Sequence, residues 1–511
     1  MQKILILDYG SQYTQLIARR IREQEVLAEI ISYDTTAEEL RAAAPKGIIL
    51  SGGPNSVFEK DAPGIDKAIF DLGIPVLGIC YGMQLMSQVL GGRVVPGAER
   101  EYGKMPIETM KDNPLFKGIP STIVVWMSHG DRVEAIPSSF ERGALSATCP
   151  FASMYDQKKN FYGLQFHPEV VHTQYGTEIL KNFVFGICQC KNDWKLTNWV
   201  DATVKDLKER IGNEEVILGL SGGVDSSVAA VLLHKAIGKN LHCIFVDNGL
   251  LRYHEAEQVE EMFKKNLGLD LTVARAAERF YEKLKGVEEP ESKRKIIGKE
   301  FIEVFTQEAR KFKHCRYLAQ GTIYPDVIES KSPKKGPSQT IKSHHNVGGL
   351  PPDLKFELIE PLKELFKDEV RAVGRVLKIS DELLDRQPFP GPGLGVRILG
   401  EVTKEKVELL QQADLRVQEE VKKLPDYKTI WQTFAVLLPC RSVGVMGDQR
   451  TYEYTCAIRS VNSLDAMTAD WTRLPYDTLA AISNRIINEV RGINRVVYDI
   501  SSKPPATIEW E

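Results

Sequence analysis

The sequence predicts an α/β protein: two doubly wound, mainly parallel-sheet domains followed by a smaller α+β domain. Two regions alternate short apolar runs with amphipathic helical patterns, one from the N-terminus and one from about residue 216. Alternation at this spacing is typical of βαβ units, whose strands lie parallel in one sheet. The C-terminal part mixes strand and helix patterns without that alternation. A length of 511 residues also suits about three domains of ordinary size.

The first alternating region opens with strand-like and helical segments in turn. Residues 11–23 have the apolar spacing of an amphipathic helix. Short apolar runs predict strands at residues 4–7, 30–33, 47–50 and 75–79. Residues 93–167 are rich in Val, Ile, Thr and aromatic side chains, which favour strands. We therefore expect further strands in that portion.

The second alternating region begins with a predicted strand, helix and strand, at residues 216–220, 226–237 and 241–246. The alternation breaks at residues 186–198 and again at 388–395, where Pro and Gly are too frequent for a regular element. These breaks predict three domains, at residues 1–190, 191–387 and 388–511.

Composition disfavours several classes of function. A formal net charge of −3 leaves no overall basic field for a nucleic acid. No run approaches the ~20 apolar residues of a membrane span, and the apolar N-terminal run is too short for a signal peptide. Eight cysteines in a chain of this length do not indicate a disulfide scaffold. We expect a cytoplasmic protein with reduced thiols that binds neither nucleic acid nor membranes.

One candidate catalytic group is a cysteine between a predicted strand and a predicted helix. Gly78, Cys80 and Gly82 form the pattern of a nucleophile elbow, a sharp turn that presents the central side chain at the sheet edge. A helix N-terminus also favours the thiolate, which is the species that attacks. His167 and Glu169 are two residues apart, so on extended backbone they point to one side. His167 would take the proton and Glu169 would fix its tautomer.

Backbone N–H groups for an oxyanion are expected in the SGGP segment at residues 51–54. Each feature alone is ordinary in a core or a turn, but SGGP, GICYGMQ and QFHPE, in this order, resemble the class I glutamine amidotransferases. The resemblance implies that glutamine acylates Cys80 and that ammonia is released. It also implies contacts near the oxyanion or the substrate for Gly53, Tyr81, Gln84 and the WMSHGD segment at residues 126–131.

A candidate phosphate site follows the first strand of the second region. Residues 221–227 read SGGVDSS, and backbone N–H groups there would converge with the helix dipole on an anion. An ordinary Gly-rich turn is the alternative, but the flanking hydroxyls and the Asp225 carboxylate, suited to Mg²⁺, favour a phosphate site. The motif is not a Walker A loop, because it lacks Gly-Lys-Ser/Thr. It resembles the PP-loop of the ATP pyrophosphatases, whose domain is adenine nucleotide alpha hydrolase-like and which cleave ATP between the α and β phosphates.

That resemblance implies ATP-binding roles for Ser221, Gly222, Gly223, Val224, Asp225, Ser226, Ser227 and Val246. Val246 ends the next predicted strand, at the carboxyl edge where the adenine should lie. Joined in one chain, the two sites predict a ligase in which ammonia displaces AMP from an adenylated acceptor. Mg²⁺ with ATP is the expected cofactor.

The long segment at residues 330–353 has no clear periodicity. It is either a dispensable insertion or a lid, and its four lysines and two adjacent histidines favour a lid over phosphate.

The acceptor is indicated by four further strings: KSHHNVGGLP, PFPGPGLGVRILGE, RSVGVMGDQR and the tail VVYDISSKPPATIEWE. They resemble the GMP synthetase family, over essentially the whole chain. The resemblance implies that the 2-oxygen of XMP attacks the α-phosphorus of ATP, that ammonia then displaces AMP, and that the third domain forms a homodimer. It implies XMP contacts for Arg294, Gln432, Asp448, Lys503 and Glu509, and lid contacts for Lys342, His344, His345 and Asn346.

Two other functions fit parts of this pattern. The same two-site ligase could act on another acceptor, such as an NAD precursor or a tRNA base; the charge disfavours tRNA and the tail disfavours both. A binding protein with relic motifs would have lost reactive groups, yet those of both motifs are present: Cys80, His167, Glu169, Ser221, Asp225 and Ser226.

Overall fold

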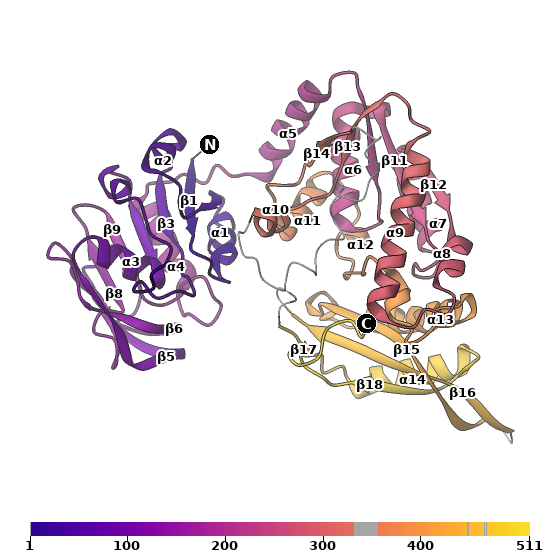
Figure 1. The fold of residues 1–511 in the computed structure, drawn as a ribbon. Helices are drawn as coiled ribbons and strands as arrows, with labels where there is room; N and C mark the ends of the chain where they lie inside the picture. The colour runs from indigo at the N-terminus through magenta and orange to yellow at the C-terminus, as the bar shows by residue number, and fades with distance from the viewer. Residues whose placement is uncertain (1, 332–355, 447–448, 464–465, 467) are drawn as a thin grey trace. The chain divides into compact units, whose positions relative to one another are not determined.

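The computed structural model describes residues 2–331, 356–446, 449–463, 466 and 468–511. The chain divides into two compact units, Met1–Trp199 and Val200–Glu511. Figure 1 shows the first unit in indigo and purple and the second in magenta through orange to yellow. None of the helices in these ranges combines the length and the apolar composition that a membrane span requires.

The first unit is built around a nine-stranded sheet in the order β2-β1-β3-β4-β9-β8-β7-β5-β6. Its parallel half contains β2 (Leu27–Ser32), β1 (Lys3–Asp8), β3 (Gly47–Leu50), β4 (Val76–Ile79) and β9 (Phe161–Leu164). Its antiparallel half contains β8 (Ser153–Asp156), β7 (Glu141–Leu145), β5 (Arg93–Thr109) and β6 (Thr122–Ala135). The four predicted N-terminal strands are confirmed, and the strand-rich portion forms the antiparallel half.

Strands β3 and β4 are buried along their whole length, as expected of parallel strands covered on both faces. Their short, continuous apolar runs therefore specify the centre of the sheet. The helices of this unit are α1 (Thr14–Arg22), α2 (Ala37–Ala43), α3 (Tyr81–Val89) and α4 (Gly176–Lys181).

The second unit contains an all-parallel sheet in the order β12-β11-β10-β13-β14. Its strands are β10 (Glu215–Gly219), β11 (Leu241–Asp247), β12 (Asp270–Arg275), β13 (Cys315–Ala319) and β14 (Glu357–Ile359). The accompanying helices are α5 (Leu196–Ile211), α6 (Val224–Ile237), α7 (Glu255–Glu260), α8 (Ala277–Leu284), α9 (Pro290–Ala309), α10 (Tyr324–Lys331), α11 (Lys367–Val376) and α12 (Asp381–Leu384).

The C-terminal part of this unit adds a second sheet, in which β16 pairs antiparallel with β15 and β17 and parallel with β18. Its elements are α13 (Lys404–Val421), β15 (Gln432–Met446), β16 (Gln449–Asn462), β17 (Asp470–Trp471), α14 (Tyr476–Glu489) and β18 (Ile493–Asp499). Ile217 and Ile244 of the parallel sheet share one buried core with Val417 of α13 and Ile486 of α14. This shared core holds the second unit together. Residues on both sides of the predicted boundary near residue 388 belong to this core. The division into three domains stays a prediction.

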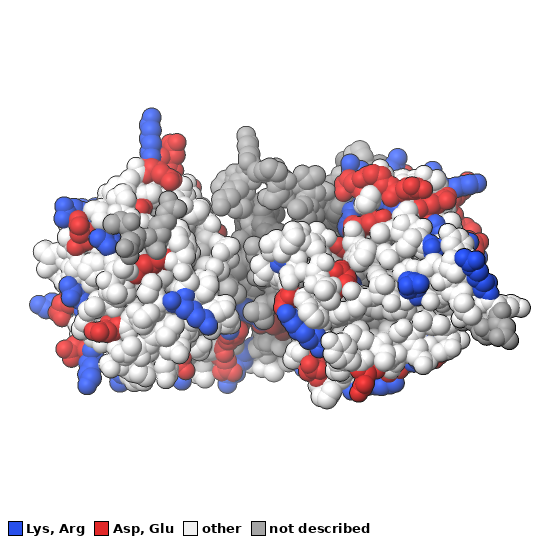
Figure 2. Space-filling model, turned by 90° about the horizontal axis from the view of Figure 1, so that it is seen from below, with Lys and Arg blue, Asp and Glu red and all other residues white. Residues whose placement is uncertain are grey.

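The predicted fold class is confirmed: both units contain an α/β sheet, and a smaller α+β part follows. On the face of each unit shown in Figure 2, Lys and Arg side chains lie interspersed with Asp and Glu. This distribution agrees with the small net charge of −3.

Candidate active sites

Cys80 lies at the turn between strand β4 and helix α3. Its backbone has φ 52° and ψ −106°, a conformation that residues with a side chain rarely adopt. The Cys80 N–H donates to Leu164 O at 2.7 Å, so strand β9 holds the turn. A Cβ on Gly82 would lie 2.3 Å from Leu50 O, so α3 can approach β3 only because residue 82 is glycine. These contacts maintain a strained turn that presents the thiol at the sheet edge.

His167 and Glu169 follow strand β9. Nδ1 of His167 lies 2.7 Å from Oε1 of Glu169, and both side chains are buried. Burial disfavours a charged imidazole, but the Glu169 carboxylate and the interaction with Cys80 outweigh it and hold the pKa of His167 well above its usual value. A protonated ring beside Cys80 favours the thiolate. The three groups thus have the arrangement of nucleophile, base and orienting carboxylate.

The thiol and the imidazole open onto a cavity of about 590 Å³, a size suited to a small ligand. Its lining includes Gly53, Cys80, Tyr81, Gln84 and His167. Nε2 of Gln84 donates to the backbone oxygen of Asp131 at 2.8 Å. The residues predicted to bind glutamine and its oxyanion therefore border one cavity with the nucleophile.

The PP-loop lies between strand β10 and helix α6. Gly222 has a φ of +75°, the left-handed conformation that the loop requires. The Oγ atoms of Ser221 and Ser226 lie 2.9 Å apart, and Oγ of Ser227 donates to Gly223 O at 2.6 Å. Helix α6 follows at once, so its free N–H groups face the loop, where they can bind an anion.

Asp225 lies in the first turn of α6, immediately after Val224. Each of its carboxylate oxygens lies 2.6 Å from Nζ of Lys367, and its side chain is 29% exposed. Carboxylate and hydroxyl oxygens are the ligands that Mg²⁺ prefers, so Asp225 beside the loop serines fits a magnesium–phosphate site. Val246 lies in β11 with its side chain in the core, at the carboxyl edge of the same sheet.

Two cations at the loop were missed by the sequence analysis. Lys367 is the first residue of α11 and follows its partner Asp225 by 142 positions. Nη1 of Arg386 donates to Gly222 O at 3.2 Å, while Nη2 donates to Glu255 Oε1 at 2.5 Å. Neither residue belongs to a motif, and α11 reaches the loop only because it packs against α6.

Three of the residues predicted to contact XMP lie on or beside the C-terminal tail. Nε2 of Gln432 donates to Oε1 of Glu509 at 2.8 Å, and Arg397 binds the same carboxylate with two nitrogens at 2.9 and 3.0 Å. Arg294 donates to the backbone oxygen of Glu511. Helix α9, strand β15 and the tail thereby meet, and Arg397, which the sequence analysis did not single out, joins the group.

Lys503 is placed elsewhere in the tail, where its Nζ donates to Ala466 O at 2.8 Å. Asp448 and the predicted lid residues lie outside the described residues: Lys342, His344, His345 and Asn346.

Three family models match the chain in succession. The model of class I glutamine amidotransferases matches residues 5–187, which include the cysteine site. The NAD synthase model matches residues 195–293, which include the PP-loop, and the model of the GMP synthase C-terminal domain matches residues 419–510.

Curated relatives match the chain from end to end. GMP synthase (glutamine-hydrolyzing) of Brachyspira hyodysenteriae is 57% identical, over 100% of this chain and 99% of its own length. The protein of the same name from Fusobacterium nucleatum is 58% identical over 99% of each chain. That from Geobacillus kaustophilus is 58% identical over 100% of this chain and 99% of its own. The chain belongs to the family of glutamine-hydrolysing GMP synthases.

Proposed function

We propose that this chain makes GMP from XMP, with ammonia that it releases from glutamine and ATP that it cleaves to AMP and pyrophosphate. The observation that carries the proposal is the presence of two chemically distinct sites in one chain. One is a thiol, an imidazole and a carboxylate beside a cavity; the other is a hydroxyl-lined loop at a helix N-terminus. The first site alone would waste glutamine, and the second alone would depend on free ammonia.

In the first site, the Cys80 thiolate attacks the side-chain carbonyl carbon of glutamine. His167 gives its proton to the departing ammonia and then takes one from the water that hydrolyses the thioester, which releases glutamate. We assign the backbone N–H groups of Gly53 and Tyr81 to the oxyanion, and Gln84 to the cavity wall that faces the substrate.

Glu169→Gln is expected to lower glutamine-driven turnover by roughly 10²-fold, because the ring loses the carboxylate that orients it and keeps it protonated. The loss should be smaller than the ~10⁴-fold seen for the orienting aspartate of a serine protease, because a thiol is the better intrinsic nucleophile. Release of glutamate is the measurement. An unchanged rate would show that Glu169 has no part in orienting His167.

In the second site, we assign the pyrophosphate to the backbone N–H groups and hydroxyls of residues 221–227 and the adenine to the backbone near Val246. The 2-oxygen of XMP attacks the α-phosphorus, pyrophosphate leaves, and ammonia then displaces AMP from C2. Asp225 would hold Mg²⁺, which would neutralise part of the phosphate charge. Lys367 and Arg386 place fixed positive charge beside the loop.

We propose that Arg294, Gln432 and Glu509 contact XMP, because hydrogen bonds bring α9, β15 and the tail together at these residues. The family resemblance alone supports the XMP contacts proposed for Lys503 and Asp448. It also supports the proposed lid, which contains Lys342, His344, His345 and Asn346. Substitution of each, with the KM for XMP as the readout, tests these assignments.

We also propose a homodimer formed through the C-terminal part. Strands β15 and β16 extend as a long hairpin beyond the rest of their sheet (Figure 1). Val443, Val445 and Tyr452 of this hairpin are all exposed, Val445 by 76%, and apolar side chains grouped on one element mark an interaction surface. Sedimentation should give twice the chain mass of 57.4 kDa, and a monomer at assay concentration would contradict the proposal.

A cytoplasmic location is proposed because all eight cysteines are free thiols in the structure, six of them buried. A disulfide in the protein isolated from cells under thiol-trapping conditions would argue against it.

The NAD synthase match raises a second acceptor, nicotinate adenine dinucleotide. A thermal-shift comparison separates the two, because only a ligand that binds the folded state raises Tm. XMP with an ATP analogue that cannot be cleaved between the α and β phosphates should raise Tm, and nicotinate adenine dinucleotide should not. The reverse result would assign the acceptor to the NAD branch.

A further inference from the structure

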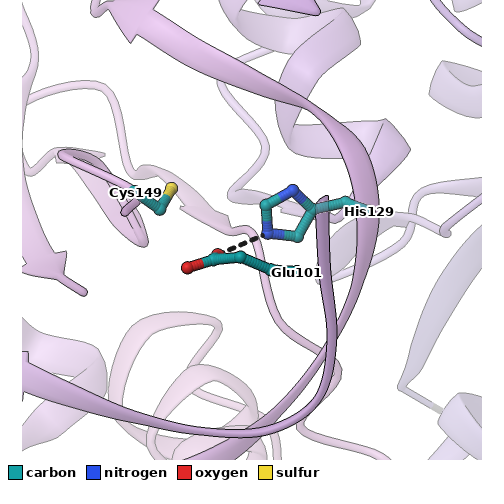
Figure 3. Close-up of side chains that lie close together, drawn as sticks. All are labelled: Glu101, His129 and Cys149. Carbon is teal, nitrogen blue, oxygen red and sulfur yellow. Dashed lines mark hydrogen bonds and ion pairs between the residues drawn. The ribbon is translucent and has the colours of Figure 1, made fainter. Parts of the chain in front are cut away.

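A second buried histidine–carboxylate pair adjoins the glutamine cavity, whose lining includes the histidine. Glu101 of β5 and His129 of β6 have side chains only 3% and 4% exposed, and Oε2 of Glu101 lies 2.9 Å from Nε2 of His129. Figure 3 shows the pair with the nearby thiol of Cys149. Neither Glu101 nor His129 contacts the catalytic pair of His167 and Glu169 in any hydrogen bond of the described residues.

The Glu101 carboxylate is held as an anion. Burial opposes its ionisation, but the hydrogen bonds from His129, Thr148 and Ser146 outweigh burial and lower the pKa of Glu101 to about 2. Burial and the charge of Glu101 raise the pKa of Cys149 to about 12, so this thiol stays neutral. The buried carboxylate is therefore held by hydrogen bonds from His129, Thr148 and Ser146.

Both ring nitrogens of His129 face oxygen atoms that only accept hydrogen bonds. Nε2 faces the Glu101 carboxylate, and Nδ1 lies 3.0 Å from the backbone oxygen of Asp131. The ring makes both bonds only when both nitrogens carry a proton. The ring then links a buried anion to one particular backbone carbonyl.

That carbonyl belongs to the cavity wall. Ser128, His129, Gly130 and Asp131 all line the cavity, and the Asp131 oxygen also accepts from Gln84. The backbone oxygen of Ser128 lies 3.7 Å from Sγ of Cys80. A displacement of this short segment would therefore move backbone groups beside the nucleophile.

Sheet pairing alone does not hold the segment in place. Strands β5 and β6 pair Glu101 with His129 and Pro96 with Asp131, and the register shifts between these pairs. Four residues of β5, at positions 97–100, thus lie opposite the single residue 130 of β6, so the regular ladder is interrupted beside the cavity. The Glu101–His129 contact lies at one end of the interruption, and the contact of His129 with the Asp131 oxygen reaches its other end.

We propose that Glu101 and His129 are positioning residues for glutamine: through Asp131 they fix the backbone of residues 128–131, which lines the glutamine cavity beside Cys80. This inference rests on the glutaminase function proposed for the cavity. In this view Glu101 and His129 determine the affinity for glutamine, whereas His167 and Glu169 take part in the chemical step.

The test uses Glu101→Gln in the full chain, with Glu141→Gln as the matched control. Glu141 lies in the same sheet and accepts from Tyr155 OH at 2.9 Å, but it does not line the cavity. Glu101→Gln should raise the KM for glutamine about 10-fold or more, because charge-assisted hydrogen bonds are lost. The ammonia-driven rate should stay within about twofold of the wild type, and Glu141→Gln should change neither quantity.

Reaction of Cys80 with two reagents separates positioning from general damage. A glutamine-mimicking diazoketone must first bind in the glutamine cavity, so Glu101→Gln should slow its reaction about 10-fold. Iodoacetamide needs only the thiolate, so its reaction should be unchanged. Equal slowing of both reagents, or no slowing of either, would overturn the inference. A wild-type Cys80 inert to the diazoketone would instead overturn the proposed function itself.

Two substitutions of His129 provide an independent test if Glu101→Gln folds poorly. His129→Asn places an amide nitrogen near the position of Nδ1 and can keep the bond to Asp131, whereas His129→Gln places one near Nε2 and cannot. The KM for glutamine should be higher in His129→Gln than in His129→Asn. Equal values would show that the effect does not pass through Asp131.

Discussion

Cys80→Ala is expected to abolish glutamine-driven GMP synthesis and to leave ammonia-driven synthesis intact. The substitution removes the thiol that borders the cavity beside His167, so loss of at least ~10³-fold in glutaminase turnover is expected. The PP-loop lies in the other unit and keeps all its contacts. GMP formation from XMP and ATP, with glutamine or with ammonium as nitrogen donor, measures both activities.

Cys440→Ala is the matched control, because Cys440 is the exposed cysteine of the chain and does not line the glutamine cavity. It should behave as the wild type with either donor. Loss of both activities in Cys80→Ala would contradict the division of labour between the two units.

Asp225→Ala is expected to abolish GMP synthesis with both nitrogen donors. The carboxylate is the candidate Mg²⁺ ligand of the loop, and its removal also frees Lys367 from a 2.6 Å ion pair. A loss of about 10²-fold or more is expected, because the charge on the departing pyrophosphate would lose its stabilisation. The glutamine site should persist, so Cys80 should still be acylated by a glutamine analogue.

Asp201→Ala controls for the loss of a carboxylate in the same unit. Asp201 forms an exposed pair with Lys235 at 3.6 Å, and such pairs contribute little. It should leave both activities unchanged. An unreactive Cys80 in Asp225→Ala would show that the two sites are coupled more tightly than proposed.

Much of the cysteine site could be predicted from sequence because its chemistry is local. An elbow requires glycines at fixed positions around the nucleophile, and Gly82 shows why: a Cβ there would meet the backbone of Leu50. His167 and Glu169 could be paired because they are two positions apart. Strands β3 and β4 could also be predicted, since each is a short buried apolar run.

The remaining groups depend on tertiary contacts that leave no local pattern. Lys367 reaches Asp225 across 142 positions. Glu101 and His129 meet because β5 pairs with β6 through a shifted register, and neither the pairing nor the shift has a sequence signal. Arg397 was missed for the same reason, since its partner Glu509 is 112 positions away.

The most direct test of the two-site mechanism is the product ratio of the complete reaction. Purified protein with XMP, ATP and Mg²⁺ should form GMP and AMP in equal amounts with glutamine or ammonia, and glutamine should also yield one glutamate per GMP. Formation of ADP in place of AMP, or no GMP with either donor, would contradict the mechanism.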